Sequence, residues 1–230
     1  SDTDSIAFLQ EKKSKKEILD LLEKINKGLP GIMELDLEDF YSRAIFVSRR
    51  GGGEGAKKKY ALIRNDGSVK IRGFETVRRD WCKLARNLQS EILKSILKSG
   101  NEKEALKTLK VVVKKLKSGD VPLEDLIIKT QLKKQMDSYL AKGPHVVAAK
   151  RMQKNGVKVY AGMMIRYFIG EVHGKTKRIG DKVFLPEEKV KYDSEYYLNN
   201  QVLPAVGNIF EVFGIDVIEV IDGERQNKLF

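Results

Sequence analysis

The sequence contains one cysteine, Cys82, and two histidines, His145 and His173, among its 230 residues. A single cysteine excludes an internal disulfide framework, and so few thiol and imidazole ligands argue against a structural zinc site. No apolar run approaches the roughly 18 residues that a membrane-spanning helix needs. The chain opens with Ser-Asp-Thr-Asp-Ser, which lacks the basic region of a signal peptide. We therefore expect a reducing, cytoplasmic setting and no membrane partner.

The sequence has fewer acidic than basic residues: 32 Asp and Glu against 44 Lys and Arg, which leaves a net charge of +12. This excess indicates a polyanionic partner, nucleic acid first and an acidic membrane surface second. Apolar residues make up 41% of the chain and charged residues 33%, which is typical of a globular protein and not of a disordered or collagenous one. The length allows one large domain or two small ones with a buried core.

Hydrophobic periodicity predicts mainly strands, with one helix, in the first third of the chain and mainly helices after it. The predicted strands cover 6–9, 32–40, 44–47, 59–64, 69–72, 126–128 and 157–168, with a hairpin turn at Asn65-Asp66-Gly67. The predicted helices run through 18–25 (ending at Gly28), 81–96, 105–116, 144–154 and 193–213, with a kink at Pro204. The stretches 49–55 and 170–181 are predicted loops. We place the boundary between a sheet-forming part and a helical part near residue 75, which makes the fold class α+β.

The strongest charge cluster is the basic band, which we define as residues 49–83. It holds eleven Lys and Arg against four Asp and Glu, a net charge of +7. The run Lys57-Lys58-Lys59-Tyr60 lies on the predicted hairpin, and Arg78-Arg79 precedes a predicted helix. Clustered cations neutralise phosphates and release counterions, which gives salt-sensitive binding without sequence preference. A solvated charged face is the alternative, but the concentration of charge on a hairpin and a helix start favours nucleic acid.

Two carboxylates, Asp2 and Asp4, lead into an apolar stretch. On a strand both side chains would point to one face, because side chains alternate along a strand. Carboxylates on one face suit a hard divalent cation such as Mg²⁺, which also binds phosphate oxygens. A solvated chain terminus is the alternative interpretation of the same two acids.

Five further residues have simple structural interpretations. His145 follows Gly143-Pro144 at a predicted helix start, where a phosphate could bind, but a structural role is the simpler interpretation. Tyr192, Tyr196 and Tyr197 are predicted to pack in the core or at its edge and not to stack on bases. Cys82 is predicted to be a small buried hydrophobe.

Several longer motifs occur in the order in which one protein family carries them. The segment 1–5 is similar to the end of that family's third palm motif, Tyr-X-Asp-Thr-Asp-Ser, and 57–61 to its motif Lys-Lys-Arg/Lys-Tyr. The segments 72–81, 142–151 and 191–204 resemble its palm-to-thumb junction and two of its thumb signatures. From residue 1 to about residue 213, the chain thus resembles the C-terminal part of archaeal-type family B DNA polymerases.

The resemblance implies an antiparallel palm remnant in residues 1–75 and a mainly α-helical thumb with a C-terminal tail in residues 76–230. It implies that Asp4 binds the Mg²⁺ ions of a two-metal catalytic site, with Asp2 as a less direct catalytic partner. The substrates would be dNTP and primer-template DNA. The residues implied in DNA contact are Lys57, Lys58, Lys59, Tyr60, Arg72, Arg78, Arg79, Thr130 and Gln131.

Other parts of the family pattern have no counterpart in this sequence: the first motif's Asp, the second motif's Lys and Tyr, the fingers and the exonuclease. We therefore expect the chain alone to be inactive and interpret it as the small subunit of a split, nucleoid-associated polymerase. A larger subunit would supply the missing parts, the rest of the palm and a strand that pairs with residues 6–9. A truncation or an excised intein would give the same N-terminus. Ser1 favours the natural split, because removal of an initiator Met would leave it.

The C-terminus resembles the opening of a sliding-clamp binding box in Gln226, Leu229 and Phe230, although the box's second aromatic is absent. A frayed tail is the alternative. Two other functions stay open for the whole chain: a non-catalytic module that binds duplex DNA, and a basic protein of a ribonucleoprotein. Asp2 and Asp4 favour the polymerase, because a pure DNA binder has no need for acids that repel phosphate.

Overall fold

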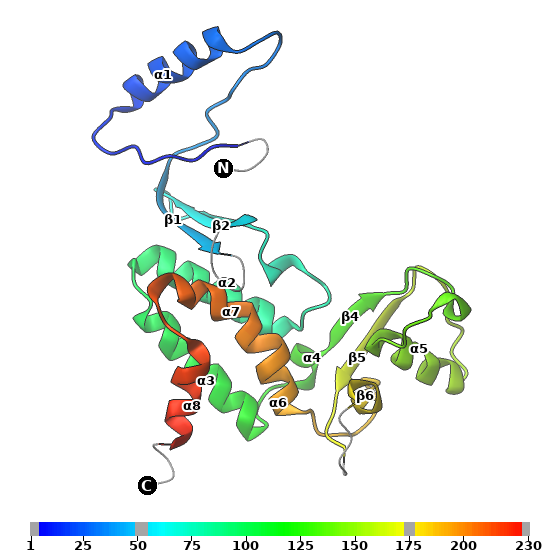
Figure 1. Cartoon of the computed structure of the whole chain (residues 1–230). Coiled ribbons are helices and arrows are strands. Elements are labelled where there is room, and N and C mark those ends of the chain that lie inside the picture. The colour runs from blue at the N-terminus through cyan, green and yellow to red at the C-terminus, as the bar shows by residue number, and fades with distance from the viewer. Residues whose placement is uncertain (1–4, 49–54, 173–177, 227–230) are drawn as a thin grey trace.

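The computed structural model describes residues 5–48, 55–172 and 178–226. Within these ranges the chain is mainly helical, and two small antiparallel sheets complete the architecture (Figure 1). The predicted α+β class is confirmed at this level. Most buried apolar side chains of the two sheets and of the helices around them belong to one continuous core.

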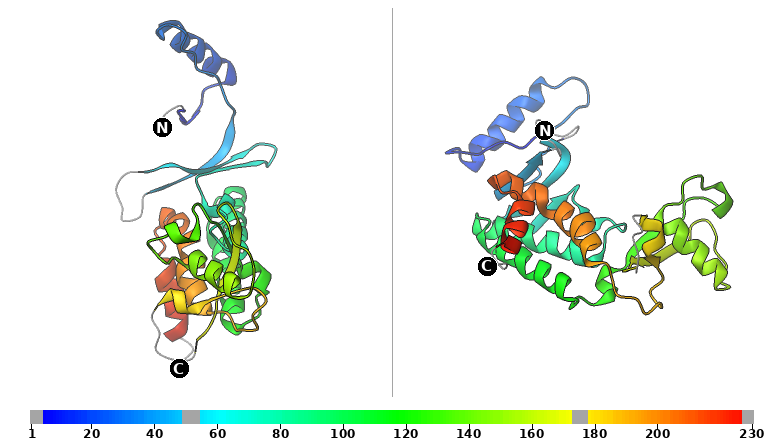
Figure 2. Two further views of the ribbon diagram at one scale, coloured as in Figure 1. Left: turned by 90° about the vertical axis from the view of Figure 1, so that its right-hand side faces the viewer. Right: turned by 60° about the horizontal axis from the view of Figure 1, so that its bottom comes forward.

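The N-terminal helix stands apart from the rest of the molecule. α1 (Lys15–Gly28) begins at Ser14, whose hydroxyl accepts a hydrogen bond from the Glu17 amide at 3.3 Å, while the Glu17 carboxylate accepts one from the Ser14 amide at 2.7 Å. Asn26 fixes the returning chain, because its side chain donates to the Leu35 carbonyl and accepts from the Leu35 amide, both at 2.9 Å. Figures 1 and 2 show α1 away from both sheets and from the other helices.

Residues 6–9 and 32–40 are not strands, contrary to the prediction. Both segments lack regular secondary structure, and no strand of the described ranges pairs with either of them. A strand needs a neighbour to satisfy its backbone groups, so the apolar pattern alone does not form one. Several of their apolar side chains stay exposed instead, among them Ile6 by 71% and Ile32 by 103%.

The first sheet has the order β1-β2-β3, with strands Tyr41–Ser48, Gly55–Arg64 and Val69–Arg72. The strand predicted at 44–47 and the predicted hairpin are confirmed. The pairing places Tyr60 of β2 opposite Phe46 on one side and opposite Arg72 on the other. In the hairpin turn, Gly67 has φ of +82°, a conformation that glycine adopts without a steric penalty. Apart from Gly55, which begins β2, the loop predicted at 49–55 falls at positions 49–54, outside the described residues.

Two packed helices, α2 (Lys83–Ser99) and α3 (Lys103–Ser118), form the centre of the helical part, as predicted. Each ends at a glycine in the left-handed conformation, Gly100 with φ of +78° and Gly119 with φ of +86°. Arg43 of β1 caps the end of α2, because its guanidinium donates to the carbonyls of Leu97, at 2.9 Å, and Lys98. This contact fixes the first sheet to the helical part.

The second sheet has the order β4-β5-β6, with strands Ile128–Gln131, Met164–Ile169 and Val183–Phe184. The short helix α4 (Leu123–Leu126) precedes β4, and α5 (Pro144–Lys154), which is predicted correctly, packs against β5. The strands predicted at 126–128 and 157–168 therefore begin too early. Before β4 the chain is helical, and before β5 it turns at Gly156 and Gly162, with φ of +81° and +92°.

The helix predicted at 193–213 is divided into four segments. They are α6 (Ser194–Tyr197), the π-helical turn η4 (Leu198–Val202), α7 (Leu203–Phe210) and the 3-10 turn η5 (Glu211–Phe213). Pro204 lies in the first turn of α7, where its missing N–H removes a backbone hydrogen bond, and the wide turn before it accommodates this loss. The last helix, α8 (Val217–Gln226), packs on α7 and is not predicted from the sequence.

Candidate nucleic-acid interface

The residues predicted to contact DNA lie on three connected parts of the fold. They are Lys57, Lys58, Lys59 and Tyr60 of β2 with Arg72 at the end of β3, then Arg78 and Arg79 after the 3-10 turn η1 (Glu75–Val77), and Thr130 and Gln131 of β4. A backbone hydrogen bond joins the last two parts, because the Lys129 amide donates to the Arg79 carbonyl at 3.3 Å. We call these nine residues the basic interface.

The β2–β3 hairpin passes very close to the chain that leaves it. The Tyr60 ring packs on the Phe46 ring, with centroids 5.7 Å apart. Lys58 is exposed and has φ of +62°, in the left-handed region. A Cβ atom placed on Gly73 would lie 1.9 Å from the Lys58 carbonyl oxygen. Only glycine fits at position 73, and this close approach fixes the hairpin to the start of the helical part.

Lys59 points into the protein and forms an ion pair. Its Nζ lies 3.0 Å from Glu75 Oε1, and the two side chains are 15% and 10% exposed. The ammonium also lies 5.1 Å from the centre of the Phe74 ring. Gln89 of α2 donates to the second Glu75 oxygen at 2.7 Å and to the Ala205 carbonyl. Lys59 thus anchors the hairpin to α2 and α7, and any DNA contact by Lys59 would compete with this pair.

Arg78 is paired on the surface with Asp80. Its Nε donates to Oδ1 at 3.0 Å and its Nη2 to Oδ2 at 2.6 Å. The hydrogen bonds from Arg78 lower the pKa of the Asp80 carboxyl and raise the pKa of the guanidinium. Because both side chains are about half exposed (54% and 48%), the pair is weak and a phosphate can replace the carboxylate. Sequence reasoning counted Asp80 only as a charge, although its spacing from Arg78 signals this pair.

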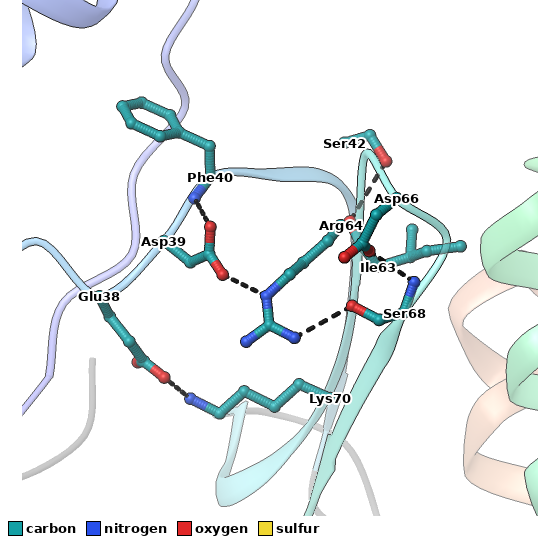
Figure 3. A network of polar contacts seen from close by, with 9 residues as sticks. All are labelled: Glu38, Asp39, Phe40, Ser42, Ile63, Arg64, Asp66, Ser68 and Lys70. Carbon is teal, nitrogen blue, oxygen red and sulfur yellow. Dashed lines mark hydrogen bonds and ion pairs between the residues drawn. The ribbon is translucent and has the colours of Figure 1, made fainter.

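Two more cations of the basic band are paired with acids that precede β1 (Figure 3). Arg64 pairs with Asp39 through its Nε and donates to the Ser68 hydroxyl at 3.1 Å, and Lys70 pairs with Glu38. The hydrogen bond from Arg64 is the main reason that the pKa of Asp39 is lowered. These pairs hold the chain that enters β1 against the hairpin. The sequence pattern does not reveal these pairs, because Asp39 lies 25 residues before Arg64 and Glu38 lies 32 residues before Lys70.

Arg72 and Arg79 differ from these paired cations. Both are exposed, and within residues 5–48, 55–172 and 178–226 neither has a carboxylate partner. On β4, Thr130 pairs with Ile165 of β5, and the Gln131 side chain donates to the Gly162 carbonyl at 2.9 Å. The two arginines therefore supply uncompensated positive charge to the basic interface, in the form of planar guanidinium groups that suit phosphate.

The residues with simple structural interpretations lie in packed positions. The His145 ring meets the Tyr139 ring edge-on at 5.6 Å, and partial burial lowers the pKa of His145. Tyr197 is buried and its hydroxyl accepts a hydrogen bond from the Ile169 amide at 3.0 Å. Burial raises the pKa of the Cys82 thiol to about 11. The predicted packing of Tyr197 and Cys82 is confirmed.

Several predicted site residues lie outside the described part of the chain: Asp2, Asp4, Leu229 and Phe230, with the side chains of Lys57 and Gln226. Among the described residues, no group of three or more His, Cys, Asp and Glu side chains could hold a metal ion. They do not form a Mg²⁺ site by themselves, so the predicted site rests on Asp2 and Asp4. In the same part of the chain, no helix is both long and apolar enough to cross a membrane.

The chain is similar to known proteins along most of its length. The profile of DNA polymerase family B matches residues 1–213. The DNA polymerases of Pyrococcus glycovorans and Thermococcus gorgonarius are 45% and 43% identical to it over 204 residues, which is 87% of this chain and 25% of each relative. The structure of the family B DNA polymerase from the hyperthermophilic archaeon Pyrobaculum calidifontis matches with a TM-score of 0.67 and 31% identity, over 89% of this chain and 26% of that one. The chain thus spans about a quarter of the length of these relatives, and it belongs to DNA polymerase family B.

Proposed function

We propose that this chain is the small, C-terminal subunit of a split family B DNA-directed DNA polymerase. Residues 1–75 would complete the palm, and residues 76–230 would form the thumb that holds primer-template duplex. The chain covers 25% of the Pyrococcus glycovorans polymerase. In this proposal, a larger subunit supplies the exonuclease, the fingers and the rest of the palm.

The arrangement of the basic interface is the observation that carries the DNA-binding part of this proposal. Arg72 and Arg79 are exposed, and the backbone of Arg79 is tied to β4. The hairpin is fixed to α2 through Lys59, Glu75 and Gln89. Rigid elements thus hold cations in place before DNA arrives. Such cations bind phosphates without sequence preference, as a polymerase requires on every primer-template.

Exposed apolar surface near the N-terminus supports a protein partner. Ile6, Phe8, Leu9, Ile32 and Met33 are 71%, 61%, 86%, 103% and 63% exposed. On α1, Leu19, Leu21 and Ile25 are a further 43%, 40% and 42% exposed. Apolar surface gathered in one region marks a protein interaction site. The larger subunit would cover α1 and the segments on either side of it.

In the assembled enzyme, Asp4 would bind Mg²⁺ and Asp2 would support it. Bound Mg²⁺ would supply charge neutralisation for in-line attack of the primer 3′-oxygen on the dNTP. The described residues would bind and orient the substrate, because the basic interface would hold the duplex that leaves the active site. Gln226, Leu229 and Phe230 would add a weak docking site for a sliding clamp.

A non-catalytic module that binds duplex DNA is the second candidate, and the basic interface supports it equally well. The two candidates differ in their need for Asp4, because a duplex binder gains nothing from a carboxylate near phosphate. Replacement of this one residue therefore separates them.

Primer extension tests the proposal with three samples: the chain alone, the chain with the larger subunit co-purified from native cells, and Asp4→Asn with that subunit. Asp120→Asn, which removes an exposed carboxylate beyond the end of α3, is the matched control. We expect extension only in the mixtures that contain the wild-type chain or the control. Full extension by the Asp4→Asn mixture would refute the catalytic role. Tight duplex binding without extension in any mixture would favour the binding module.

A further inference from the structure

A row of lysines runs along the solvent side of α3. The α3 lysine row, as we name it, has alternating spacings of four and three residues and consists of Lys103, Lys107, Lys110, Lys114 and Lys117. This spacing places all five residues on one face of the helix. Lys110 is half-buried and the other four are exposed. A different face of α3 packs in the core, through Ala105, Leu109, Val113 and Leu116.

The α3 lysine row accounts for much of the excess positive charge. α3 contains six lysines and one glutamate, a net charge of +5. The basic band has a net charge of +7, so the two segments together equal the +12 of the whole chain and the remaining residues balance. Glu104 pairs with Lys107 at 2.8 Å, but both side chains are exposed, by 65% and 71%, and such a pair is weak. The net excess of formal positive charge thus equals the sum of these two segments, and only the first contains residues of the basic interface.

The hairpin of the basic band and α3 lie on different sides of α2 and α7. In Figure 1 the first sheet lies above α2 and α7, whereas α3 lies below them, and the turned views of Figure 2 agree. The α3 lysine row is therefore separate from the hairpin that carries Lys58 and Arg72. A duplex held on the hairpin would leave the row uncovered.

The chemistry of the α3 lysine row fits the backbone of a nucleic-acid duplex. The row extends over about 21 Å of helix, with a rise of about 4.5 to 6 Å from one lysine to the next. A DNA duplex carries one phosphate charge per about 1.7 Å of its axis, so each lysine along the row has a phosphate within reach. Lysine is a hydrated point charge without the planar fork of arginine, and it contacts phosphates whatever the base sequence.

An acidic membrane surface fits less well. A helix that binds membranes combines basic residues with Trp, Phe or Leu side chains that enter the lipid. α3 contains no aromatic residue, and its one large apolar side chain that is prominently exposed is Val111, at 54%. The other apolar side chains of α3 are buried or partly buried in protein packing. The row thus offers charge without an apolar anchor.

We propose that the α3 lysine row is a second binding site for duplex DNA on this chain, independent of base sequence. It holds a stretch of duplex other than the one on the basic interface. This inference goes beyond the proposed function and does not depend on it.

Binding of a closed dumbbell duplex, which has no primer terminus, tests this site. In a background that carries Arg72→Ala and Arg79→Ala, the row variant has Lys107→Gln, Lys114→Gln and Lys117→Gln. The matched control has Lys12→Gln, Lys13→Gln and Lys16→Gln, three exposed lysines outside the row with the same loss of charge. Fluorescence anisotropy gives the affinity from about 50 to about 200 mM salt. We expect both variants to fold, because all six side chains are exposed. Melting followed by circular dichroism checks this.

Each lost phosphate contact reduces the slope of log affinity against log salt by about 0.9. Over this fourfold salt range, we expect the affinity of the control to fall about 40-fold more than that of the row variant, since three contacts are missing from the latter. Equal slopes for the row variant and the control would overturn the proposal. A row variant that still binds duplex but no longer binds phosphatidylserine vesicles would also overturn the proposal, because the row would then be a membrane-binding site.

Discussion

At the scale of single residues, neighbouring lysines of β2 differ in exposure and in role. Lys58 is exposed, whereas Lys59 is 15% exposed and paired with Glu75. The backbone is irregular here, because Lys58 has φ of +62°, and Lys59 turns inward to Glu75, so three lysines that look alike in the sequence do not all face the same partner. The acidic partner lies 16 residues away on η1, and the sequence pattern contains no signal that joins the two.

We expect Lys59→Met to lower the free energy of unfolding by about 3 kcal/mol, because Glu75 would be left buried without its charge partner. Lys58→Met, the control from the same strand, should cost at most about 1 kcal/mol. Urea unfolding followed by circular dichroism measures both. The double variant Lys59→Met/Glu75→Gln should regain most of the loss. A double variant as unstable as Lys59→Met would contradict the role of the ion pair.

The thiol of Cys82 makes stability depend on alkaline pH. Burial raises its pKa from 9.0 to about 11, and burial also raises the pKa of Tyr196 to about 12. An acid with a raised pKa keeps its proton in the folded state and loses it more easily in the unfolded state. The stability that it contributes is therefore complete below pH 9.0 and is lost as the pH rises towards about 11.

Through Cys82 alone, we expect the free energy of unfolding to fall by about 1 kcal/mol between about pH 8 and about pH 10. Cys82→Ala should remove this part of the pH dependence and keep the part that comes from Tyr196, which sets in at higher pH. Urea unfolding at intervals across this range measures the difference. Parallel pH profiles for the wild type and the variant would show that the thiol does not contribute.

At the scale of elements, Gly73 joins the hairpin to the helical part. Gly73→Ala should lower the free energy of unfolding by more than about 3 kcal/mol, because the new Cβ would lie 1.9 Å from the Lys58 carbonyl oxygen. Gly67 in the hairpin turn has a similar φ, +82°, but a Cβ placed there would meet nothing within 4 Å, so Gly67→Ala should cost about 1 kcal/mol. Urea unfolding measures both losses of stability, and their difference is the cost of the collision with the Lys58 carbonyl oxygen. Equal losses would mean that the hairpin shifts and relieves the collision.

Helices were easier to predict than strands because their signals are local. Gly100 and Gly119 end α2 and α3 shortly after the predicted stretches 81–96 and 105–116, and Pro144 begins α5 at the predicted residue. A strand depends on a partner that lies far away in the sequence, as Ile128 of β4 depends on Tyr167 of β5. Residues 6–9 and 32–40 have apolar patterns like those of strands but no described partner, so the pattern predicted strands that do not form.

At the scale of the whole molecule, the order of motifs was enough to identify the family, because it extends over most of the chain. The contacts that assemble the basic interface could not be predicted in the same way. The backbone bond from Lys129 to Arg79 joins two elements whose sequences do not signal that they are neighbours. The catalytic roles of Asp2 and Asp4 stay predictions from the motif.

The region around α1 packs little against the hydrophobic core of the molecule. α1 has 14 residues and buries one of them, Ile18, whereas α2 buries seven. A helix of this length is marginal in water without packing on one face. In the isolated chain, α1 should therefore open far more often than α2.

We expect amide hydrogens of α1 to exchange at least about 100-fold faster than those of α2 in the isolated chain, as mass spectrometry can measure. Addition of the larger subunit should slow exchange in α1, because the exposed side chains of Leu19, Leu21 and Ile25 would be covered. Leu21→Asp should abolish this slowing, while Lys24→Gln, on the same helix, should preserve it. If the subunit binds and α1 still exchanges as fast as before, α1 is not part of the interface between the subunits.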